Sequence, residues 1–446
     1  MPIKVESGVK GRLDPPFLFA AGGLLVMGSI AMLSAANPLP YYAQIVTRHS
    51  FAVIAGIAAL VLGLSFNYQV FQDQAKVVYG LIFALLSAVL VAGSTHKGHR
   101  SWFDLPFFSF QPAELARIAL ILVTAAFLDA RARRIREFST VLLAFGLAAP
   151  WMILIVKQPD FSTMLTFIPI LIGMLFCAGA DIIHLLALMG YGLVTGMMPL
   201  LFTYCQVNYP QPTPGTLPYL ILQTSRMGTA TVVVLVGASL LCLGAWRLSI
   251  WLRMQARSVF FIAVPIILAA GMLSGIVINS RLKSYQRNRF VAYVAPQADI
   301  QGAAYHVHQS QIAIGSGGLL GKGLFSGTQS QLGFLPERHT DFIYAVVGEE
   351  MGFAGTTVIL GLYLLLIWRI VTIARTARDR YGYLVCCGLA VMFGFEFVLN
   401  VGMCVGLLPV AGIPLPLISY GGSSLVITLW SLGIVANIYS RRYALL

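Results

Sequence analysis

The sequence has few charged residues: they make up 10% of its 446 residues, and only 16 are acidic. A soluble globular chain carries about 25% charged residues, so that class is excluded. An intrinsically disordered chain is also excluded, because 58% of the residues are hydrophobic. The 43 glycines follow no fixed period, which excludes a collagen-like chain. What remains is a membrane protein that is long enough for about a dozen spans.

Sequence signals for metal or nucleotide sites are weak. Cysteine is scarce, and none of the six has the spacing of metal ligands, so they are interpreted as packing residues. His306 and His308 are too close in sequence for a helical metal pair. The glycine-rich stretch 315–323 lacks the first Gly and the final Ser or Thr of a phosphate loop. It is interpreted as a flexible backbone that lines a site.

Twelve apolar runs are long enough to cross the hydrocarbon core. Lipid cannot pair with backbone groups, so helices are expected, and the alternating pattern of a membrane barrel is absent. The predicted fold is an all-α polytopic bundle, with residues 1–446 in one integral-membrane domain. The predicted spans are 15–36, 51–66, 78–94, 112–128, 140–156, 162–179, 183–203, 229–246, 259–279, 343–371, 384–409 and 424–440.

Basic residues are distributed unevenly between the predicted loops. The chain has 29 Lys and Arg and a net charge of +13. Outside the long segment 280–342, most of them fall on the same side as the N-terminus. The positive-inside rule then predicts that both termini are cytoplasmic and that segment 280–342 is extracytoplasmic, and it explains the positive charge without nucleic acid. The outer segment is itself net positive, which suggests an anionic ligand; the alternative is a solvated loop near anionic headgroups.

The segment 334–342 gathers ionisable side chains at the junction of the outer loop and a span. Glu337 and Asp341 are carboxylates, and a guanidinium and an imidazole lie between them. If the chain is helical after Pro336, both carboxylates share one helix face. An apolar boundary tends to raise the pKa of a carboxyl group, which suits a general base. The alternative is a helix N-terminus in which the acids stabilise the helix dipole.

Several other ionisable or polar groups lie within or beside predicted spans, where they are costly and functional by default. Glu114 and Arg117 are three residues apart and can pair on one helix face. For each group, interhelical hydrogen bonding and catalysis both remain open. The others are Asp160, Glu349, Glu350, Glu396 and Asn400.

Distinctive motifs occur in both halves of the chain. They are FQPAE at 110–114, QPDFST at 158–163, YQRNR at 285–289, QSQIAIGSGGLLGKG at 309–323, FLPERHTDFIYA at 334–345 and GLLPVAGIPLPLISYGGSS at 406–424. In this order they resemble the SEDS family, which comprises the RodA, FtsW and SpoVE-type proteins of bacterial cell-wall synthesis. Segment 327–332 and Arg338 look more like RodA than FtsW.

The resemblance implies a peptidoglycan glycosyltransferase that polymerises lipid II for cell-wall elongation and rod shape, with Asp341 as its essential acid. Asp341 would deprotonate the acceptor 4-hydroxyl, and undecaprenyl pyrophosphate would leave the donor. Glu337 would tune Asp341 or help to bind a divalent ion, Mg²⁺ or Mn²⁺. The predicted substrate-binding residues are Arg287, Arg289, Lys322 and Arg338 at the pyrophosphate, together with Asp160 and Glu114.

The resemblance also implies partners and a location. A class B penicillin-binding protein would cross-link the glycan beside other elongation-complex membrane proteins, at the outer face of the bacterial cytoplasmic membrane. The family core has about ten spans of near 20 residues, so region 183–279 is predicted to contain an extra pair. The alternatives are a lipid II flippase, a scaffold or an FtsW-type division polymerase. A polar cluster on one face, away from the midplane, argues against a flippase.

Overall fold

The computed structural model describes residues 13–96, 99–104, 109–225, 228–253, 258–298 and 302–443. The chain divides into two compact units. Unit 1 comprises Met1–Asp181, Gln309–Leu407 and Ala411–Leu446, and unit 2 comprises Ile182–His308 and Leu408–Val410. Of the predicted site residues, Arg287 and Arg289 belong to unit 2 and the others belong to unit 1.

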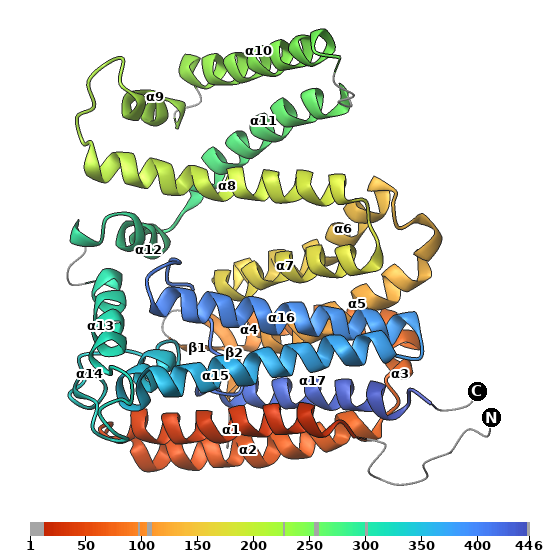
Figure 1. Cartoon of the computed structure of the whole chain (residues 1–446), viewed down its shortest axis with the longest axis vertical. Helices are drawn as coiled ribbons and strands as arrows, with labels where there is room; N and C mark the ends of the chain where they lie inside the picture. Colours follow the sequence, from red (N-terminus) through yellow and green to blue (C-terminus); the bar gives the residue numbers. More distant parts are fainter. Residues whose placement is uncertain are drawn as a thin grey trace. The chain divides into compact units, whose positions relative to one another are not determined.

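Unit 1 is a bundle of apolar helices, in which α1, α2, α15, α16 and α17 lie side by side (Figure 1). The chain passes from unit 2 into unit 1 within α13. The helices are α1 (Pro15–Ala36), α2 (Tyr42–Ser65), α3 (Gln69–Asp73), α4 (Ala75–Ala92), α5 (Pro112–Ala130), α6 (Phe138–Lys157), α7 (Phe161–Ala178), α13 (Ala303–Ser316), α14 (Thr328–Gln331), α15 (Ile343–Thr376), α16 (Arg380–Cys404) and α17 (Gly422–Ser440).

Eleven helices among the described residues are long and apolar enough to cross a membrane, and they confirm the predicted polytopic helical fold. The predicted span 112–128 corresponds to the remaining long helix, α5. It contains Glu114, Arg117 and Asp129, and most of its residues are buried. It packs against α4, α7 and α16. Because other helices surround α5, it does not need the uniformly apolar composition of a lipid-facing span.

Several predicted spans have wrong boundaries, and two of them have a clear local cause. Helix α2 begins at Tyr42, directly after the turn that contains Pro40, and not at residue 51. Helix α16 ends at Cys404, and not at residue 409. The left-handed Gly406, with φ +79°, ends that helix in the way glycine commonly does.

A small antiparallel sheet lies between α4 and α5 in the chain and was not predicted. Its strands are too short to give a periodic pattern in the sequence. Ser101, on the middle strand, donates to the carbonyl oxygen of Gln158 at 2.9 Å, and Gln158 donates to that of Leu86 at 3.0 Å. The sheet is therefore bonded to the end of α6, where Gln158 is the C-cap residue. The strands are β1 (Ser94–His96), β2 (His99–Asp104) and β3 (Ser109–Phe110).

Unit 2 has a small hydrophobic core formed by Met198, Phe202, Met272 and Ile276. Helices α8 and α11 pack against each other, and α10 packs against α11. These three apolar helices occupy the region 183–279, where the extra pair of spans remains a prediction. The elements are α8 (Ile182–Asn208), α9 (Leu217–Thr224), α10 (Thr229–Trp251), α11 (Ser258–Arg281) and α12 (Ser284–Val294), followed by a 3₁₀ turn (Pro296–Ala298).

Helix α15 is interrupted at Gly352, whose φ of 64° and ψ of −162° are not helical. Such a break frees backbone groups that lipid cannot satisfy. Loop 317–323 supplies the partners. The amides of Lys322 and Gly323 donate to helix carbonyl oxygens before the break, each at 3.0 Å, and two helix amides after the break donate to loop carbonyl oxygens at 2.9 and 3.0 Å. The loop that was expected to be flexible is therefore hydrogen-bonded to α15.

The contact between this loop and α15 leaves no room for a side chain at Gly321 of the loop or at Gly352 of the helix. A Cβ at Gly352 would lie 2.3 Å from the backbone nitrogen of Gly321. A Cβ at Gly321 would lie 2.2 Å from the carbonyl oxygen of Glu350. Both glycines also have positive φ, which other residues rarely adopt. Glycine is therefore required on both sides of this contact.

The helix bundle of unit 1 has two ends, which are defined by where its helices begin and end. Helix α1 begins and α17 ends at the same end (Figure 1), which we call the terminal end. There Arg369 forms an ion pair with Asp14, and the Tyr68 hydroxyl donates to Asp379 at 2.8 Å. At the opposite end α1 ends and α15 begins. This end contains segment 334–342 and is called the site end.

Substituting Gly352→Ala should lower the free energy of unfolding of the purified protein by about 1–3 kcal/mol. The reason is that alanine at this position would have a strained backbone and would clash with the loop. Gly361→Ala is the matched control on the same helix, since a Cβ at Gly361 meets nothing within 4 Å. Thermal unfolding in detergent measures both variants. Equal stability of the two variants would contradict the proposed contact.

Candidate active site

The two predicted catalytic carboxylates, Glu337 and Asp341, lie at the site end in the segment that leads into α15. Residues 336–342 form turns and not a helix, so the expected shared helix face is wrong. Glu337 has a positive φ of 48°, and its carbonyl oxygen accepts from the amide of Phe342 at 3.3 Å. This bond closes a turn that contains both carboxylates, and both side chains are half-buried. A backbone strained in this way persists only when its surroundings hold it.

The main chain of this turn is held by helix α16 and by the loop that leads into α17, residues 411–421, here called the C-terminal loop. The Asn400 amide group donates to the main-chain oxygen of Asp341 at 3.0 Å. The Ser419 hydroxyl donates to the main-chain oxygen of Thr340 at 2.7 Å. The amide of Tyr420 donates to the preceding carbonyl group, that of residue 339, at 2.9 Å. The C-terminal motif therefore positions the backbone beside Asp341.

Arg338 connects the same turn to α1. It is buried, and its Nε donates to the carbonyl oxygen of Ala35 at 2.9 Å. Burial lowers the pKa of the guanidinium from its ordinary value, although arginine remains protonated in proteins. This contact gives Arg338 a structural role. Its role at the substrate pyrophosphate remains a prediction.

Aromatic rings lie next to the turn. The ring centroid of Tyr420 is 5.7 Å from that of His339 and 6.4 Å from that of His49. Burial raises the pKa of Tyr420, and nearby Arg48 opposes this shift. The phenol therefore stays protonated and neutral at neutral pH beside the ring of His339.

Glu349 is a fully buried carboxylate near the start of α15. It accepts from the backbone amides of Gln329 and Ser330 at 2.8 and 2.9 Å. It also accepts from Nζ of Lys322 at 2.9 Å and from the hydroxyl of Thr328 at 3.1 Å. A buried charge is tolerated only with such a set of donors. Lys322, predicted to bind pyrophosphate, is thus paired in this structure.

The neighbouring carboxylate of Glu350 binds the chain that follows loop 317–323, between residues 325 and 331. It accepts from the hydroxyls of Ser34 at 2.5 Å and Ser330 at 3.1 Å. It also accepts from the side chain of Gln331 at 3.0 Å and the amide of Phe325 at 3.2 Å. Glu350 therefore joins the loop to α1, one residue from the Arg338 contact. Of the two roles left open for Glu349 and Glu350, these contacts support the structural one.

Asp160 caps the start of α7. It accepts from the amide and the hydroxyl of Thr163, at 3.0 and 2.7 Å, and from the side chain of Gln111 at 2.8 Å. Two of the sequence motifs therefore meet at one carboxylate. The Asp160 side chain is half-exposed, and its predicted contact with substrate remains a prediction.

Glu114 takes part in a buried ionic triad between α5 and α16. The predicted pair with Arg117 is confirmed, and Arg117 also pairs with Glu396. All three side chains are almost fully buried. Removing one member of such a group leaves an uncompensated buried charge, so the triad is important for helix packing. Substrate binding by Glu114 remains a prediction.

The other predicted ligands lie on α12 of unit 2, which contains Arg287 and Arg289. Their role at the pyrophosphate remains a prediction. Among the described residues, no group of three or more His, Cys, Asp or Glu could hold a metal ion. Mg²⁺ often binds one or two carboxylates together with substrate phosphates. A divalent ion at Glu337 and Asp341 would therefore need oxygen ligands from the substrate.

These features define a multi-pass membrane protein with a polar site at one end of a helix bundle. The FtsW/RodA/SpoVE family, described as cell cycle proteins, matches residues 16–211 and 216–444. The chain belongs to this family, as its motifs predicted.

Named relatives and solved structures agree with this membership. The chain is 33% identical over 436 residues to the peptidoglycan glycosyltransferase MrdB of Escherichia coli K12, which covers 97% of the chain and 95% of MrdB. A solved chain from a peptidoglycan synthase complex that coordinates polymerization and crosslinking has a TM-score of 0.65 and 29% identity, with 97% and 99% covered. The crystal structure of Thermus thermophilus RodA has a TM-score of 0.58 and 26% identity, with 97% and 98% covered.

Substituting Glu349→Gln should speed hydrogen exchange at the amides of Gln329 and Ser330 by roughly tenfold or more, because bonds to a charged acceptor contribute about 1.5–3 kcal/mol each. Hydrogen–deuterium exchange of a peptide covering residues 322–331 measures this. Glu137→Gln is the matched control at an exposed carboxylate. Unchanged exchange in Glu349→Gln would show that the carboxylate does not hold the loop.

Proposed function

We propose that this chain polymerises lipid II into glycan strands and that Asp341 is the general base of the reaction. The chain is a peptidoglycan glycosyltransferase resembling RodA, as its family and relatives show. The observation that supports the assignment of the base is the position of Asp341. Its half-buried carboxylate lies on a turn that α1, α16 and the C-terminal loop hold in place.

The proposed reaction transfers the donor sugar to the acceptor. Asp341 takes the proton of the acceptor 4-hydroxyl, whose oxygen forms a bond to the anomeric carbon of the donor. The bond from that carbon to the pyrophosphate oxygen breaks, and undecaprenyl pyrophosphate leaves with the bonding electrons. General-base catalysis contributes about 10²–10⁴-fold. Glu337, in the same turn, orients or tunes Asp341.

The charge that develops on the leaving pyrophosphate requires preorganised cations. Lys322 is the candidate at the site end of unit 1, and its ammonium group is fixed by Glu349 and Thr328. Arg338 lies in the catalytic turn itself. Arg287 and Arg289 are candidates from unit 2.

We also propose the orientation of the chain and its partners. The arginines of the α5–α6 turn and those that flank α15 and α17 lie at the terminal end, as the positive-inside rule requires of a cytoplasmic face. The site end then faces outward from the bacterial cytoplasmic membrane. A class B penicillin-binding protein is the proposed partner within an elongation complex, supported by the likeness to a chain from a synthase complex.

Asp341→Asn should lower lipid II polymerisation by about 10²–10⁴-fold while the protein remains folded, because the amide cannot accept the acceptor proton. The assay uses purified protein with its cognate penicillin-binding protein, whose own chemistry is blocked by a β-lactam. Glycan strands are resolved by electrophoresis, and Glu137→Gln is the control.

Strands from both the wild type and Asp341→Asn would mean that the base is misplaced, and Glu337 and Asp160 would be tested next. An intact complex that makes strands with neither protein would favour a lipid II flippase or a scaffold. Strands from the wild type alone establish the polymerase and its base together.

Cysteine labelling tests the orientation. Leu320 at the site end and Tyr443 at the terminal end are both 82% exposed, so Leu320→Cys and Tyr443→Cys are matched reporters. A membrane-impermeant maleimide should label Leu320→Cys in intact spheroplasts and Tyr443→Cys only after lysis. The opposite pattern would reverse the proposed orientation.

A further inference from the structure

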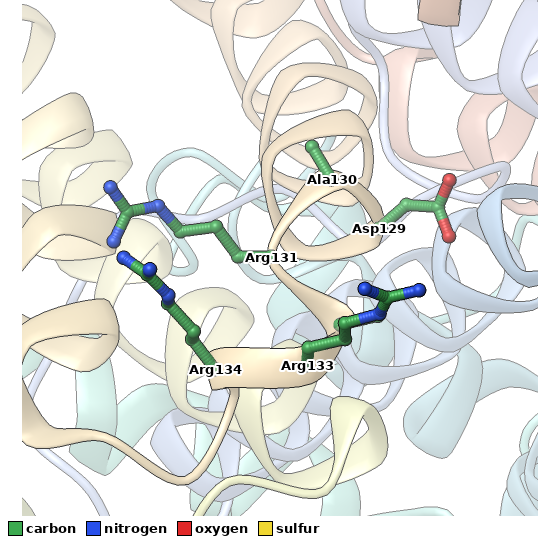
Figure 2. Close-up of a pocket in the computed structure, with 6 residues that line it drawn as sticks. Asp129, Ala130, Arg131, Arg133 and Arg134 are labelled. Carbon is green, nitrogen blue, oxygen red and sulfur yellow. The ribbon is translucent and has the colours of Figure 1, made fainter.

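A second polar site lies at the terminal end of unit 1, where α5 ends. A short 3₁₀ helix, Ala132–Arg134, follows α5 and turns the chain toward α6. The pocket at this turn has a volume of about 490 Å³. It is lined by Asp129, Ala130, Arg131, Ala132, Arg133 and Arg134 (Figure 2).

The backbone of this turn is fixed by hydrogen bonds. The amide of Arg134 donates to the carbonyl oxygen of Arg131 at 2.9 Å. The carbonyl oxygen of Arg134 accepts from the amide of Glu137 at 3.1 Å and from the hydroxyl of Thr140 at 2.8 Å. The neighbouring Ile135 is buried at 8% exposure. The three arginines therefore extend from a held backbone and not from a loose loop.

The positive charge of this pocket exceeds its negative charge, because three arginines and one aspartate line it. Asp129 accepts from the side chain of Gln72 at 2.8 Å, and Glu137 accepts from the hydroxyl of Ser139 at 3.0 Å. Among the described residues, no ion pair joins either carboxylate to Arg131, Arg133 or Arg134. By contrast, the buried Arg117 and the partly buried Arg369 and Lys322 are all paired with acids. An anion from outside the chain would complete this site.

The arrangement of the guanidinium groups fits a phosphate. Figure 2 shows Arg131 and Arg134 extending in the same direction, whereas Arg133 extends to the other side, toward Asp129. The Arg131 guanidinium lies 5.3 Å from the ring centroid of Phe127, a cation–π contact that restricts its movement. Two neighbouring guanidinium groups repel each other, and each can bind phosphate oxygens through two parallel N–H groups.

We propose that Arg131 and Arg134 bind the phosphate of an anionic phospholipid headgroup, while Arg133 adds positive charge from the other side of the same turn (Figure 2). The pocket lies at the end of α5, which packs against the apolar helices α4, α6 and α7. The proposed orientation of the chain places this end at the cytoplasmic surface of the membrane. Basic pockets between spans on the cytoplasmic side bind such headgroups. The orientation rule alone requires positive charge in this turn, but it does not require a fixed backbone or a pocket.

The test measures lipid binding to the full-length protein, purified and delipidated in detergent. Dioctanoyl phosphatidylglycerol and dioctanoyl phosphatidylcholine are added separately. Native mass spectrometry counts the bound lipid molecules, and the shift in melting temperature gives a second measure of binding. The pocket variant is Arg131→Gln/Arg133→Gln/Arg134→Gln. The charge-matched control, Lys76→Gln/Arg375→Gln/Arg378→Gln, removes three exposed cations that do not line the pocket. Inorganic phosphate and glycerol 3-phosphate form the third arm.

We expect the pocket variant to bind phosphatidylglycerol about a hundredfold more weakly than the wild type, and the control to bind like the wild type. Phosphatidylcholine should bind weakly to all three proteins. Saturation by inorganic phosphate at the affinity of the lipid would overturn the lipid assignment and leave a site for a soluble phosphate. Equal loss in the pocket variant and the control, or no loss in either, would overturn the site itself and leave these arginines with orientation alone.

Discussion

A helix that breaks inside a membrane must find partners for the backbone groups that it frees, and the site end of unit 1 is organised around this requirement. Helix α15 breaks at Gly352, and loop 317–323 pairs with both sides of the break. Glu349 and Glu350, just before the break, then bind the next part of the loop through their side chains. Backbone pairing and buried charge therefore act on the same stretch of chain.

The arrangement explains why motifs far apart in the sequence meet. Glu350 reaches Ser34 on α1, and Arg338 reaches the next residue, Ala35. Asn400 and Ser419 bind the other side of the catalytic turn. Each contact positions backbone or loop and leaves the carboxylates of Glu337 and Asp341 half-exposed. The contacts of Asn400 and Ser419 therefore hold the main chain around Asp341.

The helices of the fold could be predicted from the sequence more reliably than the contacts between them. Long apolar runs identify spans because hydrophobicity and length are local properties. The Glu114–Arg117 pair was also predictable, since residues three apart on a helix face each other. The contact of Glu350 with Ser34 was not, because its partners are 316 residues apart and neither residue type specifies the other.

The same distinction applies to the candidate site. The motif 334–345 drew attention to Glu337 and Asp341, but its turn conformation depends on contacts with α1, α16 and the C-terminal loop. A helix was a reasonable local expectation after Pro336, and tertiary contacts replaced it with a turn that has Glu337 at positive φ. The strands were missed because they are too short to give a periodic pattern, and the bond from Ser101 to Gln158 joins residues 57 apart.

The link between Ser34 and Glu350 also has a consequence for biosynthesis. Chains are made from the N-terminus at about 5–20 residues per second, so roughly 15–60 seconds separate the synthesis of these two residues. Through that interval the end of α1 is already in the membrane without its partner, and loop 317–331 does not yet exist. The site end is therefore completed late, because α15, α16 and the C-terminal loop that hold the catalytic turn are made last. A ribosome that stalls before this point leaves a chain that has several spans but no active site.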